Sequence, residues 1–120
     1  MRRAEQAVYG LARLGFGAAL MSRPDRFGAL LVGDEAREPS VRAGLRAYGT
    51  RDTVLGLATL RAVLSGSDVR PWVAAGIASD MLDTLAQVTD WADLPADRRV
   101  GGVAAAVASA AVGVALLARA

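Results

Sequence analysis

The chain has 120 residues, 53% hydrophobic and 22% charged, with fourteen basic residues, twelve acidic residues and a formal net charge of +2. This length gives room for one domain, and the composition argues against disorder. There is no His and no Cys, which excludes imidazole bases, imidazole metal ligands, thiolate nucleophiles, zinc knuckles and disulfides. The basic residues, all Arg, form no stripe of the kind that follows a phosphate backbone. We therefore expect a single domain over residues 1–120, no enzymatic activity, no cofactor and no nucleic-acid partner.

The first half of the chain predicts two helices. The first runs from about Ala4 to Met21 and ends at a Ser-Arg-Pro-Asp break. The apolar run Phe27 to Val32 is too short to cross a bilayer, so we expect it to be interfacial or re-entrant. Asp34 to Pro39 is predicted to be a charged linker, and Ser40 is a suitable N-cap for a second helix that continues through Leu64.

The second half predicts two more helices. After a turn at Ser65 to Arg70, proline in the first-turn position starts a helix from Pro71 to about Asp90. Trp72 and Trp91 lie near its two ends, roughly 28 Å apart along a helix, which is close to the hydrocarbon thickness of a bilayer. The alternative is two unrelated tryptophans at a chance spacing. The last helix is predicted at Gly101 to Ala118, a stretch without a charge.

The composition of these helices favours a membrane. Gly102, Ala106 and Ala110 form a row of small residues in the last helix, and such rows permit close helix contact in lipid. The other helices are apolar but interrupted by charges, so a soluble helical bundle remains an alternative. We predict an all-α fold, a four-helix transmembrane bundle with a short interfacial or re-entrant segment after the first helix. It would be a multi-pass inner-membrane protein whose partners are the lipid bilayer and either further copies or another membrane protein.

The arginines predict an orientation for such a bundle. With four spans, one side of the membrane holds four arginines: Arg2, Arg3, Arg70 and Arg119. The other side holds seven: Arg23, Arg26, Arg37, Arg42, Arg46, Arg98 and Arg99. The positive-inside rule then makes the second side cytoplasmic and places both termini outside.

Six ionisable side chains lie within the predicted helices: Arg13, Arg51, Asp52, Arg61, Asp80 and Asp83. A charge at the centre of a bilayer costs at least about 2.5 kcal/mol, so such residues normally face the bundle interior and a partner. Arg61 lies close to the end of its helix and can extend its guanidinium to the interface. The other five need partners.

Glycines accompany the charges at a repeated spacing. The positions i, i+3 and i+7 hold Gly10, Arg13 and Gly17 in the first helix and Gly49, Asp52 and Gly56 in the second. Residues so spaced share one helix face, which predicts that the charge lies where another helix can approach closely. The strings YGLARLGFG and YGTRDTVLG indicate either an internal repeat or a chance match in a biased composition.

The third helix carries a polar stripe. It consists of Gly76, Asp80, Asp83 and Gln87, and counting along the helices places the two carboxylates near the middle of the bundle. We predict that Arg13 pairs with Asp80 and Arg51 with Asp83. Asp52 is left for a backbone group, a hydroxyl or a further Arg. The candidate intramembrane network is thus Arg13, Arg51, Asp52, Asp80, Asp83 and Gln87, with no catalytic, cofactor-binding or metal-binding residue assigned.

Three interpretations of this network remain open. The charges are structural ion pairs that fix the register of the helices, or Asp80 and Asp83 form a proton or cation site because two nearby carboxylates cannot both ionise cheaply. In the third, the carboxylates hold magnesium in an enzyme that acts on lipid or isoprenoid phosphates. Gly76 and Asp80 match one step of the CDP-alcohol phosphotransferase signature. The next Asp is three rather than four residues on, however, and the upstream part of the signature is absent.

The segments RDTVLGLATL and GIASDMLD, from Arg51 and Gly76 onward, carry a resemblance. With the Gly-rich first helix, they make the chain similar to a group of small uncharacterised four-helix bacterial membrane proteins that are DoxX-like in outline. The resemblance covers about Val8 to Ala118 and implies a four-span inner-membrane bundle without an assigned activity. We expect a scaffold or accessory protein, with a small proton- or cation-coupled transporter as the alternative and a soluble helical bundle third.

Overall fold

The fold is that of a computed structural model, which describes residues 3–119 and contains no strand in that range. Its α-helices are α1 (Arg3–Ser22), α2 (Pro24–Val32), α3 (Pro39–Ser65), α4 (Arg70–Thr89) and α5 (Arg99–Ala118). Two short 3-10 helices, η1 (Gly33–Arg37) and η2 (Trp91–Asp93), lie between them. The all-α prediction is confirmed, and the four long helices begin and end within two residues of their predicted limits. Arg2, counted above for the orientation, lies outside the described residues.

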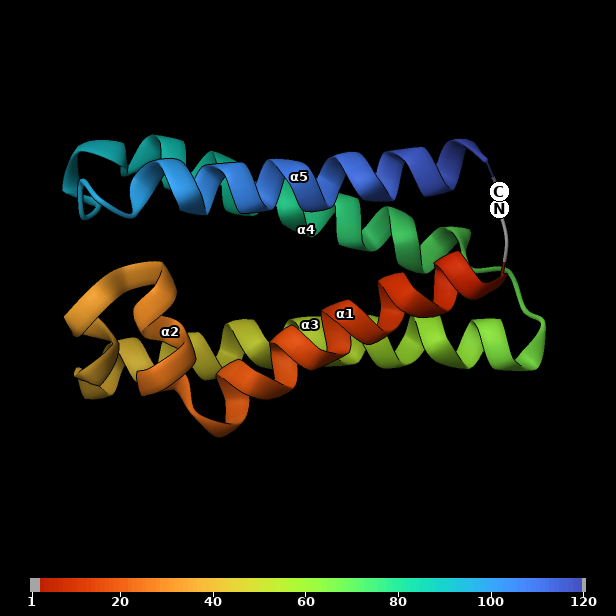
Figure 1. The fold of residues 1–120 in the computed structure, drawn as a ribbon, viewed down its shortest axis with the longest axis horizontal. Coiled ribbons are helices and arrows are strands. Elements are labelled where there is room, and N and C mark those ends of the chain that lie inside the picture. The colour runs from red at the N-terminus through yellow and green to blue at the C-terminus, as the bar shows by residue number, and fades with distance from the viewer. Residues whose placement is uncertain (1–2, 120) are drawn as a thin grey trace.

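The long helices alternate in direction and form two layers. One layer contains α1 and α3 with α2 at one end, and the other contains α4 and α5 (Figure 1). The start of α1, the turn between α3 and α4 and the end of α5 therefore lie at the same end of the molecule. An ion pair of 3.0 Å between Glu5 and Arg119 joins α1 to the residue that follows α5 at this end.

Local sequence explains several of the helix boundaries. Pro39 and Pro71 lie in the first turns of α3 and α4, where a missing N–H is tolerated. Gly66 ends α3 with a left-handed φ of 72°, and its N–H bonds back to the last turn. The predicted charged linker differs from the structure, because most of it forms η1.

The glycine faces of α1 and α3 pack directly against each other. A Cβ built on Gly17 would lie 2.5 Å from the carbonyl oxygen of Gly49, and one built on Gly56 would lie 2.8 Å from that of Gly10. A side chain at these positions would therefore force the backbones apart. The prediction that the charged residues share a face with close helix contact is confirmed.

The prediction of four transmembrane helices is wrong. Within residues 3–119, only α5 is long and apolar enough to cross a membrane, with a mean hydropathy of 2.2 over its best window. The other long helices fail because charges interrupt them, notably Arg13 in α1, Arg51 and Asp52 in α3, and Asp80 in α4. The fold is a bundle of two helix pairs with one candidate membrane span, and a multi-pass arrangement is not supported.

The short segment predicted to be interfacial or re-entrant is α2, which begins three residues earlier than expected. It packs on the bundle through Leu31 and Val32, against a buried cluster of Leu20, Ala36 and Leu45. A second cluster lies near the other end of the molecule and contains Tyr9, Ala62, Val63, Val69, Val73 and Leu116. The middle of the bundle, between these clusters, holds the charged residues.

Candidate functional site: a buried arginine and aspartate network beside a cavity

Arg13 connects all four long helices. Its side chain extends from α1 and is only 5% exposed. One terminal nitrogen donates to Asp52 of α3 at 3.0 Å, and the other donates to Asp80 of α4 at 2.7 Å and to Ser109 of α5 at 3.2 Å. Charge-assisted hydrogen bonds of this length are among the strongest polar contacts in proteins. The contact between the two layers is thus centred on one guanidinium.

Arg51 forms the second centre of the network. Its two terminal nitrogens donate to the two carboxylate oxygens of Asp83, at 2.8 and 2.7 Å, in a bidentate pair between α3 and α4. Arg51 also donates to Asp52 at 3.3 Å, on the same oxygen that Arg13 contacts. Asp52 therefore bridges the two arginines, and five charged groups form one continuous cluster.

Sequence spacing identified most of this arrangement. Both predicted pairs, Arg13 with Asp80 and Arg51 with Asp83, are present. Of the partners left open for Asp52, a further Arg is the one present, and Asp52 accepts hydrogen bonds from both Arg13 and Arg51. Gln87 differs from the expectation, since its amide donates to the backbone carbonyl of Asp83 at 3.3 Å within α4 and not to a side chain of the cluster.

Three polar partners of the network were missed. Ser109 is the only polar residue of α5 between Val100 and Ala118. Its isolated position could have identified it as a partner of the network, but the prediction considered only charged residues and Gln87. The hydroxyl of Tyr9 accepts a bond of 3.2 Å from Arg13, one helical turn away, and the ring of Tyr48 lies 4.5 Å from the Arg51 guanidinium. Each tyrosine precedes its arginine by three or four residues, so the helical spacing contained this information.

The network has an excess of negative charge. Three carboxylates face two guanidinium groups, and the side chains of Asp52 and Asp80 are each 6% exposed. Burial raises the pKa of Asp52 above its usual value, although the neighbouring arginines act in the opposite direction. Burial also raises the pKa of Tyr9 and of Tyr48, so both phenols remain neutral.

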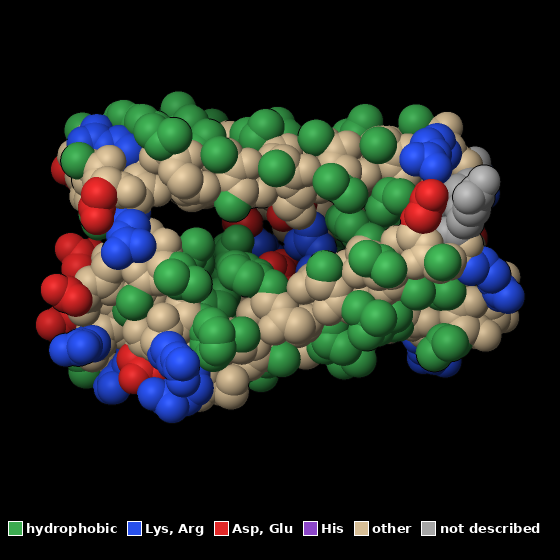
Figure 2. Space-filling view, in the orientation of Figure 1, with side chains coloured by type: hydrophobic (Ala, Val, Ile, Leu, Met, Phe, Trp, Pro, Cys, Tyr) green, Lys and Arg blue, Asp and Glu red, His purple; other side chains and the backbone are tan. Residues whose placement is uncertain are grey.

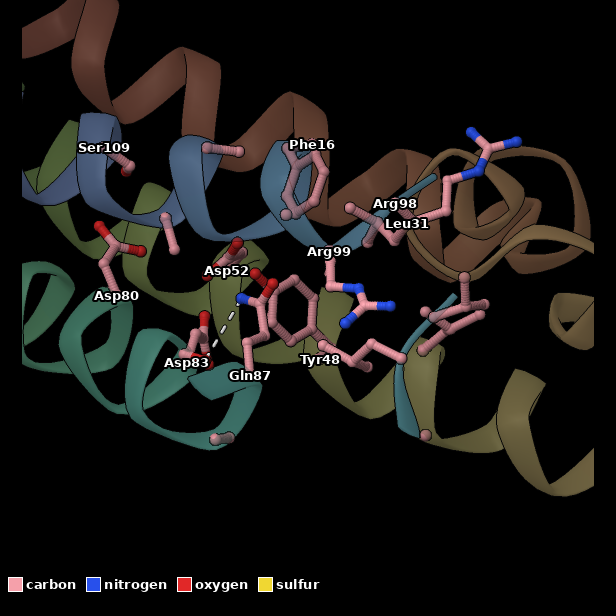
Figure 3. Close-up of a pocket in the computed structure, with 18 of the residues that line it drawn as sticks. Phe16, Leu31, Tyr48, Asp52, Asp80, Asp83, Gln87, Arg98, Arg99 and Ser109 are labelled. Atoms are coloured by element: carbon pink, nitrogen blue, oxygen red, sulfur yellow. Dashed lines mark hydrogen bonds between the residues drawn. The ribbon is translucent and has the colours of Figure 1, made fainter. Parts of the chain in front are cut away.

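A cavity of about 660 Å³ lies beside the network, between the two layers. Figure 2 shows a hollow there, with charged side chains visible in the middle of the molecule and hydrophobic side chains over the outer surface. In Figure 3, Ser109 and Asp80 lie toward one end of the view, and Leu31, Arg98 and Arg99 toward the other. The cavity volume falls in the range of small-molecule sites.

The magnesium interpretation has no support in this geometry. In the part of the chain that the structure describes, no group of three or more acidic side chains is arranged to hold a metal ion. The carboxylates that it requires, Asp80 and Asp83, instead accept hydrogen bonds from Arg13 and Arg51.

Comparisons with known proteins add no family. No protein-family model matches the chain, and no curated protein or solved structure is significantly similar to it. The resemblance to DoxX-like proteins therefore stays a prediction.

Proposed function

We propose that this protein is a bilayer-bound scaffold or accessory protein that is held in the membrane by α5. The observation that carries the proposal is the surface of α5: only 17% of its most apolar window is buried inside the bundle. An apolar helix of this length is also found in the core of soluble proteins, but such a helix is mostly buried, and α5 is not. Lipid chains would cover the exposed valines of this helix, including Val100, Val107, Val112 and Val114.

The distribution of polar groups supports the same proposal. The side chains of Arg13, Asp52 and Asp80 are buried, whereas large hydrophobic residues of every long helix are exposed. On α4, beside α5, these include Met81, Leu82, Leu85 and Val88. Met81, Leu85 and Val88 share one face of α4 by their spacing, and an exposed apolar face of this kind marks a protein or membrane contact. A protein stable in water normally has the reverse distribution.

The role of the network in this proposal is structural. Arg13 and Arg51 link α1 and α3 to α4, and the bonds of Arg13 are strengthened by burial, since the side chains of Arg13 and Asp80 are only 5% and 6% exposed. They fix how the two helix pairs align, leaving the exposed face of α5 for lipid and the other exposed apolar residues for a second copy or a membrane protein partner. An accessory role needs this rigid placement and no reaction chemistry.

The test is membrane association of the full chain with a charge placed on α5. Ala108 lies at the middle of α5 on its exposed face, so Ala108→Arg would put a guanidinium in the hydrocarbon region, at a cost of at least about 2.5 kcal/mol. Ala43→Arg is the matched control, because Ala43 is exposed on the charged first turns of α3. We expect wild type and Ala43→Arg to float with vesicles after alkaline carbonate treatment, and Ala108→Arg to be largely released. Release of the wild-type chain would contradict the proposal.

A proton- or cation-coupled transporter is the second candidate. The charge excess in the network favours it, because one carboxylate in such a cluster can bind a proton or cation. The cavity also reaches Asp52, Asp80 and Asp83. This candidate predicts that Asp80→Asn abolishes a pH-dependent flux in reconstituted vesicles. Absence of any flux with the wild-type protein would eliminate it.

A further inference from the structure

The cavity has walls of two kinds. Its apolar wall comes from α2, α1 and α3, and includes Leu31, Val32, Val41, Leu45 and Phe16. Its polar rim comes from the start of α5 and includes Arg98 and Arg99. A site that is apolar along one wall and charged at one edge fits an amphiphile better than a fully polar molecule.

The charge available at this rim is positive. Among residues 3–119, Arg99 has no hydrogen-bond or ion-pair partner, and its only recorded contact is with the ring of Trp91 at 5.5 Å. Arg98 has a long contact of 3.4 Å with Asp97, and its buried Nε has no hydrogen-bond acceptor. Guanidinium groups bind carboxylates and phosphates through paired N–H donors. The rim therefore offers donors for an anion.

The inner end of the cavity offers no comparable site for a cationic head group. Asp80 and Asp83 accept bonds of 2.7 Å from Arg13 and Arg51, and Asp52 accepts from both arginines. These carboxylates already have guanidinium partners, whereas Arg99 has no ion-pair partner among residues 3–119 and contacts only the ring of Trp91. Electrostatic complementarity thus favours a ligand whose head group is negatively charged.

We propose that this cavity binds a single-chain amphiphile with an anionic head group, which pairs with Arg99 while its hydrocarbon chain lies along the Leu31 and Leu45 wall. The shared chemistry is a carboxylate or phosphate on an alkyl chain. A fatty acid and a lysophospholipid-like phosphate are the two sources that the experiment must distinguish. The site is independent of how the protein is anchored, since it lies between the two layers.

The experiment uses the full chain in a nonionic detergent and cis-parinaric acid, a fluorescent fatty acid. Binding is followed by energy transfer from tryptophan, because Trp91 lies at the Arg99 rim. We expect saturation at one probe per chain. Dodecanoate and dodecyl phosphate should displace the probe, and the stronger of the two identifies the source, whereas dodecanol and dodecylamine should displace it at least tenfold less well.

Two pairs of variants locate the site. Arg99→Gln should weaken binding of the probe about tenfold or more, and Arg46→Gln, which removes an exposed charge away from the cavity, should leave it unchanged. Gly44→Phe should fill the cavity, since Gly44 lines it and an added Cβ meets nothing within 4 Å. Gly15→Phe is its control, because Gly15 is equally open and lies outside the cavity.

Three results would overturn the inference. They are the absence of saturable binding, displacement by dodecylamine as strong as by dodecanoate, and equal affinity of Arg99→Gln and wild type. Far-UV circular dichroism checks that the variants fold. If Gly44→Phe fails to fold, the comparison of Arg99→Gln with Arg46→Gln decides the matter.

Discussion

Replacing Arg13 with Met removes the group that joins the four long helices. Among residues 3–119, Arg13 is the only side chain that donates to the Asp80 carboxylate, so this partner is lost, while Asp52 keeps Arg51 at 3.3 Å. Removing one partner of a buried pair costs about 3–5 kcal/mol, because the remaining charge is left unpaired in a low dielectric. We expect Arg13→Met to lower the free energy of unfolding by about this amount, since the side chains of Arg13 and Asp80 are only 5% and 6% exposed.

Asp80→Leu should be the milder change. It leaves Arg13 paired with Asp52 and makes the network electrically balanced, with two carboxylates and two guanidinium groups. Its cost should lie nearer to that of one lost hydrogen bond to a charged group, about 1.5–3 kcal/mol. In the double variant, each remaining carboxylate of the network still has Arg51 as a partner. The loss in free energy of unfolding should therefore be smaller than the sum of the two single losses by about 1–3 kcal/mol.

The assay is denaturant unfolding of purified protein in mild detergent, for the wild type, the two single variants and the double variant. The order of stability should be wild type, then Asp80→Leu, then Arg13→Met, with positive coupling in the cycle. The reasoning is refuted if Arg13→Met costs less than about 1 kcal/mol, well below the range for a broken buried pair. It is equally refuted if the two single losses add without coupling.

Three further predictions follow from the packing and from the phenols. Gly17→Ala should lower stability by about 1–3 kcal/mol in thermal unfolding, because its Cβ would meet Gly49, whereas Gly15→Ala, with open space around it, should be neutral or slightly stabilising. Ser109→Ala should cost about 1 kcal/mol by the same measurement, since Arg13 loses an acceptor at 3.2 Å; no change would mean that the bond contributes nothing. The chain has two tyrosines, and the pKa of each is raised above the ordinary tyrosine value of 10. In the folded protein, tyrosinate absorbance should therefore appear only at a pH above 10. In the unfolded protein, the titration midpoint should return to about 10. Because the unfolded chain loses these protons first, stability should fall as pH rises above 10, and titration at the ordinary pH in the folded state would contradict the burial of both rings.

Local signals were sufficient to predict the helices and part of the network. Pro71 correctly marked the first turn of α4, whereas the prediction that Ser40 caps α3 is wrong, because the N-cap is Glu38 and Ser40 lies inside the helix. The pairing of Arg13 with Asp80 followed from helix direction and residue depth, because alternating helices bring equal depths together. The glycine faces were predictable because spacing on one helix fixes which residues share a side.

The remaining features depend on distances between helices, which spacing does not contain. Whether Asp52 reaches one arginine or two depends on how closely α1 approaches α3. Ser109 contacts Arg13 only because the small residues Ala106 and Ala110 face inward and bring α5 close to the bundle. The prediction of four membrane spans failed for a different reason, since a high Ala and Gly content suggested spans in α1, α3 and α4 that their charges do not allow.

The central claim is that α5 lies in the hydrocarbon of a bilayer while the charges lie inside the bundle. The chain has no cysteine, so Ala108→Cys and Ala43→Cys each create a unique labelling site for an environment-sensitive fluorophore. In vesicles, the claim predicts that the fluorophore at residue 108 is quenched by lipids with spin labels deep in the acyl chain and is protected from aqueous iodide. The fluorophore at residue 43 should show the opposite pattern. Quenching of both fluorophores by iodide, with no effect of the deep spin label at residue 108, would contradict the claim.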